Sequence, residues 1–217
     1  MSAISEIPLL HADPWLLAVH KPAGLLSQPG LGPALADSLI TRIQRQWPSA
    51  RLVHRLDQAT SGLLLLALDP LTHRELSRAF AERRVRKTYL AQVQGCPVGR
   101  GGWIDVPLAR IGTQPPRYGH VSVAEGGKSA LTRWRRLSSG DGSSLVLLAP
   151  HTGRSHQLRV HLALLGHPIV GDAIYGQSDS GGLRLHATGL RLRHPHTGEP
   201  LRLRCLPSWH GAARLQS

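Results

Sequence analysis

The sequence predicts one folded unit of mixed α/β class, in which strands are combined with amphipathic helices. The chain has 217 residues, which is enough for one substantial core, and no low-complexity linker divides it. Apolar runs of strand length recur at residues 15–19, 63–68, 88–93 and 145–149. Stretches with apolar residues at helical spacing lie between or after these runs. We therefore expect one domain over residues 1–217.

Three helices are predicted from this spacing and from residues that begin or end helices. In the first, apolar residues occupy every fourth position until a proline ends the pattern: Leu35, Leu39, Ile43, Trp47 and Pro48. The second has Asp69 as its N-cap, Pro70 as its first residue, and an inner face of Leu76, Ala79 and Phe80. The third has Ser155 as its N-cap, ends at Gly166, and has an inner face of Leu158, His161, Leu162 and Leu165.

Two further segments have distinct patterns. Residues 111–127 are rich in Gly and Pro, show no periodicity and carry Arg117, Tyr118 and His120, so we expect a long exposed loop. Residues 190–193 and 201–204 alternate Leu with Arg across a turn, which predicts a hairpin with arginines on one face. These arginines either protect a sheet edge from aggregation or form a strip that faces RNA.

The charge of the chain is strongly positive. Lys and Arg number 26 against 13 Asp and Glu, which gives a formal charge of +13. The expected partner is a polyanion, most often nucleic acid, although a solvated positive surface is the alternative. Aromatic residues are only 4% of the chain, which argues against a base-stacking platform. Recognition would then depend on Arg and Lys.

The cysteines and histidines favour neither a disulfide framework nor a metal site. Cys96 and Cys205 are far apart and lack a Cys-x-x-Cys partner, which is typical of a reducing compartment. His156 and His161 are five residues apart without a His-Glu-x-x-His motif, and we interpret His161 as a hydrogen-bonded core residue. The chain shows no leader pattern and no apolar run of about 18 residues, so we expect a cytoplasmic protein without a membrane partner.

Asp57 is the most conspicuous candidate for chemistry. The run His54-Arg-Leu-Asp-Gln-Ala-Thr-Ser-Gly62 places this carboxylate at the entrance of the apolar strand 63–68. No Walker loop and no Gly-x-Ser-x-Gly motif is present, so nucleotide hydrolysis and a serine nucleophile are not supported. The remaining candidates are Asp57, Tyr89 and Arg154. An acid paired with an arginine is often only structural, so the residues alone leave that alternative open.

A basic run lies between the second helix and the strand 88–93. It comprises Arg83, Arg84, Arg86 and Lys87. Such runs are commonly solvated loops, but a position just before Tyr89 favours a grip on phosphates.

Six segments carry a resemblance to a known family over nearly the whole chain. They are residues 13–25, 54–62, 87–91, 153–161, 166–172 and 185–187, and they include Gly153-Arg-Ser-His-Gln-Leu-Arg-Val-His161. Together and in this order they resemble the RluA family of RNA pseudouridine synthases. One departure is His20, where the family commonly has Asn before Lys-Pro. The resemblance implies a mostly antiparallel sheet around a central cleft, with flanking helices and with Asp57 in the cleft.

The resemblance also implies roles for individual residues. Asp57 would be the nucleophile that breaks the uridine N-glycosidic bond, with Arg154 as its ion-pair partner. Tyr89 would stack beneath the uracil and is a candidate base for the proton lost from carbon. Leu185 would form an apolar wall, and Arg55 would fill the space of the extruded base. The reaction needs no cofactor.

The chain resembles a particular subgroup of that family. It has no room for the S4-like N-terminal domain of larger members, and Arg42-Ile-Gln-Arg45 is similar to the small members. Those members modify a uridine in 23S ribosomal RNA and one in the tRNA anticodon stem-loop. We therefore expect a monomer whose partner is 23S rRNA, tRNA or both.

Two rival functions rank below this one. A non-catalytic RNA-binding or ribosome-assembly factor predicts that the acid is lost, yet Asp57, Tyr89 and Arg154 are all present. A hydrolase that uses Asp57 on a glycosidic substrate needs a second carboxylate, and no convincing one stands out.

Overall fold

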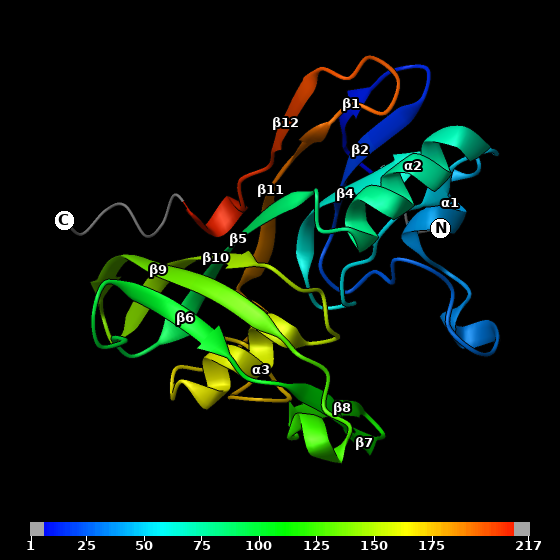
Figure 1. Cartoon of the computed structure of the whole chain (residues 1–217). Helices are drawn as coiled ribbons and strands as arrows, with labels where there is room; N and C mark the ends of the chain where they lie inside the picture. Colours follow the sequence, from blue (N-terminus) through cyan, green and yellow to red (C-terminus); the bar gives the residue numbers. More distant parts are fainter. Residues whose placement is uncertain (1–6, 211–217) are drawn as a thin grey trace. The chain divides into compact units, whose positions relative to one another are not determined.

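A computed structural model describes residues 7–210 of the chain (Figure 1). The chain divides into two compact units: unit 1 is Met1–Arg86 with Ala187–Leu206, and unit 2 is Lys87–His186 with Pro207–Ser217. Each unit contains mostly antiparallel strands and few helices, which confirms the predicted mixed α/β class. The single catalytic domain and the central cleft stay predictions. Within residues 7–210, no helix is long and apolar enough to cross a membrane.

Unit 1 is built on a sheet in which β2 pairs with β1 and β4, β4 with β3 and β11, and β11 with β12. Its strands are β1 (Leu9–Ala12), β2 (Leu16–Lys21), β3 (Arg51–Leu52), β4 (Ser61–Ala67), β11 (Leu185–Arg193) and β12 (Pro200–Arg204). The first two residues of β11 belong to unit 2. Its helices are η1 (Pro33–Leu35), α1 (Leu39–Ile43) and α2 (Pro70–Ala81).

Helix α2 begins and packs as the sequence predicts. Asp69 is the N-cap, and its Oδ1 accepts a hydrogen bond from the backbone N–H of Thr72 at 2.9 Å. Leu76 and Ala79 are buried in a core cluster with β2, β4, β11 and β12, and Phe80 packs against that cluster. This packing places α2 along β4, as Figure 1 shows.

The first predicted helix is wrong in extent. Instead of one helix from Leu35 to Trp47, the chain forms η1, an extended link and the five-residue α1. Ser38 is the reason, because its hydroxyl accepts from the Thr41 N–H while the Thr41 hydroxyl accepts from the Ser38 N–H. This capping box starts the helix there and leaves Leu35 outside it, 43% exposed.

Unit 2 has an antiparallel sheet in the order β5-β10-β9-β6 and a separate hairpin, β7-β8. Its strands are β5 (Arg86–Gln94, whose first residue belongs to unit 1), β6 (Gly101–Asp105), β7 (Leu108–Thr113), β8 (Pro116–His120), β9 (Leu131–Gly140) and β10 (Ser143–Pro150). Its helices are η2 (Val123–Glu125), α3 (Gln157–Leu164) and η3 (Ser208–His210).

The β7-β8 hairpin corrects the prediction of a long exposed loop over residues 111–127, since the segment is exposed but forms strands. Most residues of both strands are at least partly exposed, so the period-two alternation that marks a half-buried strand is missing from the sequence. The hairpin is held by Tyr175, whose hydroxyl accepts from the Tyr118 N–H at 2.9 Å.

Helix α3 confirms one prediction about its residues and overturns another. His161 is fully buried, and its ring nitrogens bond to Thr132 Oγ1 at 3.0 Å and to the Val106 carbonyl at 3.1 Å, as expected of a core histidine. Burial lowers its pKa, so the ring stays neutral. Ser155, however, is not the N-cap. That position belongs to His156, which adopts a left-handed conformation with φ of 54° and makes no side-chain cap.

Candidate active site

The loop that carries Asp57 is fixed through its backbone to the segment that follows β2. Ser27 Oγ donates to the Leu56 carbonyl at 2.8 Å and accepts from the Leu56 N–H at 3.1 Å. On the other side of Asp57, the Gln58 carbonyl accepts from the Gly24 N–H at 2.9 Å. Both neighbours of Asp57 are therefore tied down, which limits the positions open to the half-buried carboxylate between them.

Lys21 is the charged group that accompanies Asp57 in unit 1. Its side chain is fully buried, and Nζ donates to the carbonyls of Pro22 at 2.9 Å, Leu25 at 2.7 Å and Gln58 at 3.1 Å. Burial lowers the pKa of the Lys21 ammonium to about 8, although the nearby Asp57 carboxylate acts to raise it. At neutral pH the lysine is therefore charged and places a cation beside Asp57.

The start of β4 is shaped by two contacts that also belong to unit 1. Gly62 has φ of 115°, and a Cβ there would lie 2.6 Å from the backbone nitrogen of Ala187, so only glycine fits. His54 Nε2 accepts from the Leu65 N–H at 3.0 Å, and its ring stacks on Phe80. The motif 54–62 therefore anchors both ends of the loop to β4.

Arg55 is exposed, whereas Asp57 is half-buried. An exposed guanidinium beside a half-buried carboxylate is free to contact a large ligand. A role toward RNA stays a prediction.

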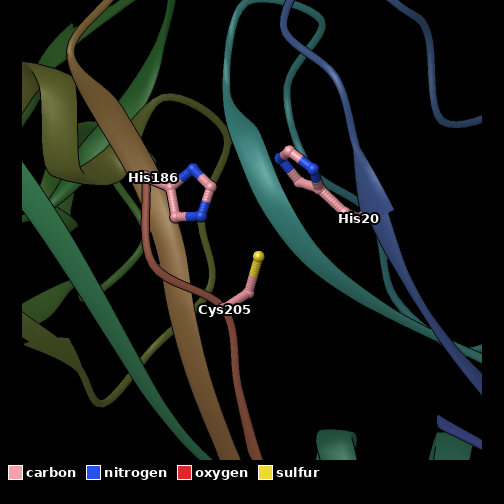
Figure 2. A group of neighbouring side chains, drawn as sticks. All are labelled: His20, His186 and Cys205. Atoms are coloured by element: carbon pink, nitrogen blue, oxygen red, sulfur yellow. The ribbon is translucent and has the colours of Figure 1, made fainter. Parts of the chain in front are cut away.

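His20 lies next to Lys21 and is half-buried. Its pKa is lowered by burial and by the Lys21 charge, so the ring is neutral at pH 7. Figure 2 shows His20 with Cys205, whose Sγ lies within 4.8 Å of a ring nitrogen of His20 in unit 1. The third side chain drawn, His186, is the last residue of unit 2. Burial raises the pKa of the Cys205 thiol, which keeps it neutral.

In unit 2, Arg154 lies on a loop that Gln157 organises. Gln157 Oε1 accepts from the Arg154 N–H at 3.0 Å and from the Thr152 hydroxyl at 2.6 Å. The Arg154 Nε donates to the Ser129 carbonyl at 3.1 Å, and Lys87 Nζ donates to the Thr152 carbonyl at 3.1 Å. Lys87 therefore contributes to the Arg154 loop, besides any contact with RNA.

Tyr89 and Leu185 also belong to unit 2. Tyr89 lies on β5 opposite Leu148 of β10 and is half-buried. Leu185 is the first residue of β11 and is 3% exposed. Their roles at the uracil stay predictions, as does the ion pair of Asp57 with Arg154.

The basic run follows α2 and is mostly exposed. Arg83, Arg84 and Arg86 are exposed, and Arg83 ends the helix region with φ of 59°. Arg84 Nε donates to Glu82 at 2.7 Å, and Arg78 bonds the same carboxylate at 2.7 Å. Arg84 is thus already paired, whereas no acid among residues 7–210 lies within ion-pair distance of Arg83 or Arg86.

Sequence reasoning missed Lys21, Ser27 and Gln157. The signal for Lys21 was a lysine at the end of an apolar strand, immediately before Pro22. Ser27 carries no recognisable signal, because its partner Leu56 is 29 residues away. Gln157 stands in the segment 153–161, next to the residues that were singled out.

Comparisons with known proteins identify the family. A family model for RNA pseudouridylate synthases matches residues 15–164. A dual-specificity RNA pseudouridine synthase RluA of Yersinia pestis is 45% identical over 202 residues, which cover 91% of this chain and 97% of the relative. The protein of that name from Escherichia coli (strain K12) is 43% identical over 198 residues, which cover 89% and 90%.

A solved structure agrees with this result. The human RNA pseudouridylate synthase domain containing 1 superimposes with a TM-score of 0.80 at 29% identity, covering 98% of this chain and 88% of the human one. The chain belongs to the RNA pseudouridylate synthase family. It is an RNA pseudouridine synthase, and thus an isomerase.

Proposed function

We propose that the chain converts specific uridines in structured RNA to pseudouridine, with Asp57 as the nucleophile. The observation that carries this role is the Asp57 loop: a half-buried carboxylate, held by backbone bonds on both sides and accompanied by the charged Lys21. A carboxylate that is fixed in place beside a cation suits nucleophilic catalysis.

The proposed reaction rearranges bonds without a net change in composition. The bond between N1 of the uracil and C1′ of the ribose breaks, and a bond between C5 and C1′ forms. A proton leaves C5, and N1 gains one. No electron acceptor or donor is needed, which agrees with a reaction that uses no cofactor.

The family resemblance supplies the proposed roles of three residues of unit 2. Arg154 is proposed as the ion-pair partner of Asp57, Tyr89 as the residue that stacks on the uracil and takes the C5 proton, and Leu185 as the wall that keeps water from the base. The support for Arg154 is its loop, which Gln157 and Lys87 hold in place. The support for Tyr89 is its half-buried position on β5.

A uridine within a folded RNA must leave its stack before Asp57 reaches it. Extruding a base costs a few kcal/mol, and a side chain that fills the gap offsets part of this cost. Arg55 suits this role because it is exposed and lies two residues from the nucleophile. Arg83, Arg84, Arg86 and Lys87 are proposed to grip the surrounding phosphates.

The proposed substrates are a uridine in 23S rRNA and one in the tRNA anticodon stem-loop. The relatives of Yersinia pestis and Escherichia coli carry dual specificity in their names, and this chain aligns with at least 90% of the length of each. We expect one catalytic domain that acts as a monomer in the cytoplasm, where both RNAs occur.

The test is to incubate the protein separately with 23S rRNA and tRNA transcripts and to map pseudouridine in each. We expect modification of one site in each RNA by the wild type and none by Asp57→Ala. Absence of pseudouridine in both RNAs, or equal activity of the variant, would contradict the proposed function. Product in only one RNA would contradict dual specificity.

A further inference from the structure

The β11-β12 hairpin carries four arginines on one face. The register pairs Arg191 with Arg202, Gly189 with Arg204 and Arg193 with Pro200, so Arg191, Arg193, Arg202 and Arg204 all share that face. All four are exposed, whereas Leu190, Leu192 and Leu203 on the opposite face are buried in the core with α2. We call these four residues the arginine strip; Figure 1 shows its two strands side by side.

The strip is electrostatically unfavourable by itself. Arg191 and Arg202 lie directly opposite each other, and like charges in such cross-strand pairs destabilise a sheet. Within residues 7–210, no carboxylate lies within ion-pair distance of any of the four; Arg193 only donates to the Gly198 carbonyl at 2.9 Å. An anion bound across the strip would relieve this repulsion.

Protection of a sheet edge does not explain the strip. Edge protection places charges on the outermost strand, which in unit 1 would be β12. Arg191 and Arg193, however, lie on β11, which also pairs with β4 and is therefore not the outermost strand. Half of the strip is thus on an internal strand, where an edge device has no use.

The position of the strip relates it to the Asp57 loop. β11 approaches β4 where Gly62, five residues after Asp57, meets the backbone of Ala187. Residues on one face of a strand repeat every 6–7 Å or so, so Arg191 and Arg193 lie about 13 and 20 Å along β11 from that point. From the point where β11 meets Gly62, the strip therefore extends away along β11 for about 13 Å, from Arg204 opposite Gly189 to Arg193.

We propose that the arginine strip binds the phosphate backbone of the RNA stem next to the target uridine. The strip contains no aromatic ring on which a base could stack, and guanidinium groups suit phosphate oxygens. Contacts of this kind position the RNA without reading its sequence. The inference rests on the proposed function, because it assumes that the target uridine binds at Asp57.

The experiment compares two double variants with a matched control. Arg191→Gln/Arg193→Gln and Arg202→Gln/Arg204→Gln each remove two charges from the strip. Arg74→Gln/Arg78→Gln removes two exposed arginines of α2, in the same unit, that are paired with Glu75 and Glu82. Arg191→Lys/Arg193→Lys keeps the charge of the strip. Binding of a labelled tRNA anticodon stem-loop is measured by anisotropy over a range of salt concentrations.

Each glutamine variant of the strip is expected to raise Kd and KM for the RNA by about tenfold and to leave kcat unchanged. The slope of log K against log salt should become shallower by about one unit for each phosphate contact that is lost. The lysine variant should keep the wild-type slope. The α2 control is expected to bind RNA with the wild-type Kd and salt slope. Strip variants that bind RNA as the α2 control does would overturn the proposal. Strip variants that aggregate but keep the wild-type slope would also overturn it, because they would indicate edge protection instead. Pseudouridine is mapped in parallel, so a wild type that binds with the expected slope yet forms no product refutes the function and not the strip.

Discussion

Lys21 is unusual because its charged side chain is fully buried. A lysine is rarely fully buried, because removing its charge from water is costly. Here three carbonyl oxygens and the Asp57 charge compensate for that cost. Because one of the three carbonyls belongs to Gln58, the lysine joins the end of β2 to the residue that follows the nucleophile. We therefore assign it a positioning role.

The pKa of Lys21 predicts how activity depends on pH. Since this pKa is about 8, the ammonium loses its proton in the folded protein as the pH rises through 8. We expect kcat/KM of the wild type to fall above pH 8. At pH 7, Lys21→Met should lower kcat/KM by about 100-fold, because Asp57 would be misplaced. Lys128→Met, at an exposed lysine, is the matched control and should change neither value.

Deprotonation of Lys21 should lower activity but raise the free energy of unfolding. Between pH 8 and 10.5 the unfolded chain keeps the Lys21 proton while the folded chain has lost it, so the free energy of unfolding rises with pH in this window. The comparison is the wild type against Lys21→Met by urea unfolding. A difference between the two that stays constant from pH 8 to 10.5 would show that the lysine is not perturbed.

At the scale of elements, α3 is attached to the segment after it by a buried ion pair. Arg159 donates from Nε and Nη2 to the two oxygens of Asp172, at 2.7 and 2.6 Å. Asp172 also accepts from the N–H groups of Ile174 and Tyr175. Burial acts to raise the pKa of Asp172, but these bonds outweigh it and the net pKa is lowered. Through Tyr175 the pair also supports the β7-β8 hairpin.

Loss of this pair should be costly. In Asp172→Ala the Arg159 guanidinium remains buried and loses its carboxylate, so we expect the free energy of unfolding to fall by about 3–5 kcal/mol. Asp105→Ala, at an exposed carboxylate of β6 in the same unit, should change it by less than about 0.5 kcal/mol. Chemical denaturation measures both. Equal effects of the two substitutions would contradict the assignment.

At the scale of the whole molecule, the formal charge of +13 agrees with a polyanionic substrate. Much of this charge is not paired. Arg83 and Arg86, like the arginine strip, have no carboxylate within ion-pair distance among residues 7–210, in contrast to Arg74 and Arg78 of α2. We expect these unpaired arginines to contact RNA, together with Arg84, which is paired with Glu82.

The basic run gives a prediction at this scale. Replacing Arg83, Arg84 and Arg86 with Gln should weaken RNA binding and flatten its salt dependence, by up to about three units of slope if all three contact phosphates. The Arg74→Gln/Arg78→Gln variant is again the control. A triple variant that binds RNA with wild-type affinity and slope would remove these residues from the interface.

The sequence predicted elements that depend on local signals. The Asp69-Pro70 cap, the apolar strand β4 and the Leu-Arg alternation of β11 and β12 are each confirmed because neighbouring residues determine them. The β7-β8 hairpin was missed because its exposure removes the alternation that marks strands. Ser155 was the wrong cap because His156 enters the helix in a left-handed conformation.

The candidate site residues were predicted from motifs, whereas the hydrogen bonds that hold them in place were not. Asp57 was recognisable from its place before β4, but the bonds that hold its loop come from Ser27 and Lys21, 29 and 37 residues from their partners. Contacts across such separations leave no periodic signal. The roles of Tyr89, Arg154, Leu185 and Arg55 rest on family resemblance and remain to be measured.

The most direct test of the central claim is release of tritium from RNA that carries [5-³H]uridine. Forming the C5–C1′ bond expels the hydrogen at C5, so each pseudouridine made releases one label. We predict release by the wild type, and a rate at least about a thousandfold lower for Asp57→Asn, which keeps the size of the side chain and removes its charge. A folded Asp57→Asn protein that releases tritium at the wild-type rate would contradict the assignment of Asp57 as the nucleophile.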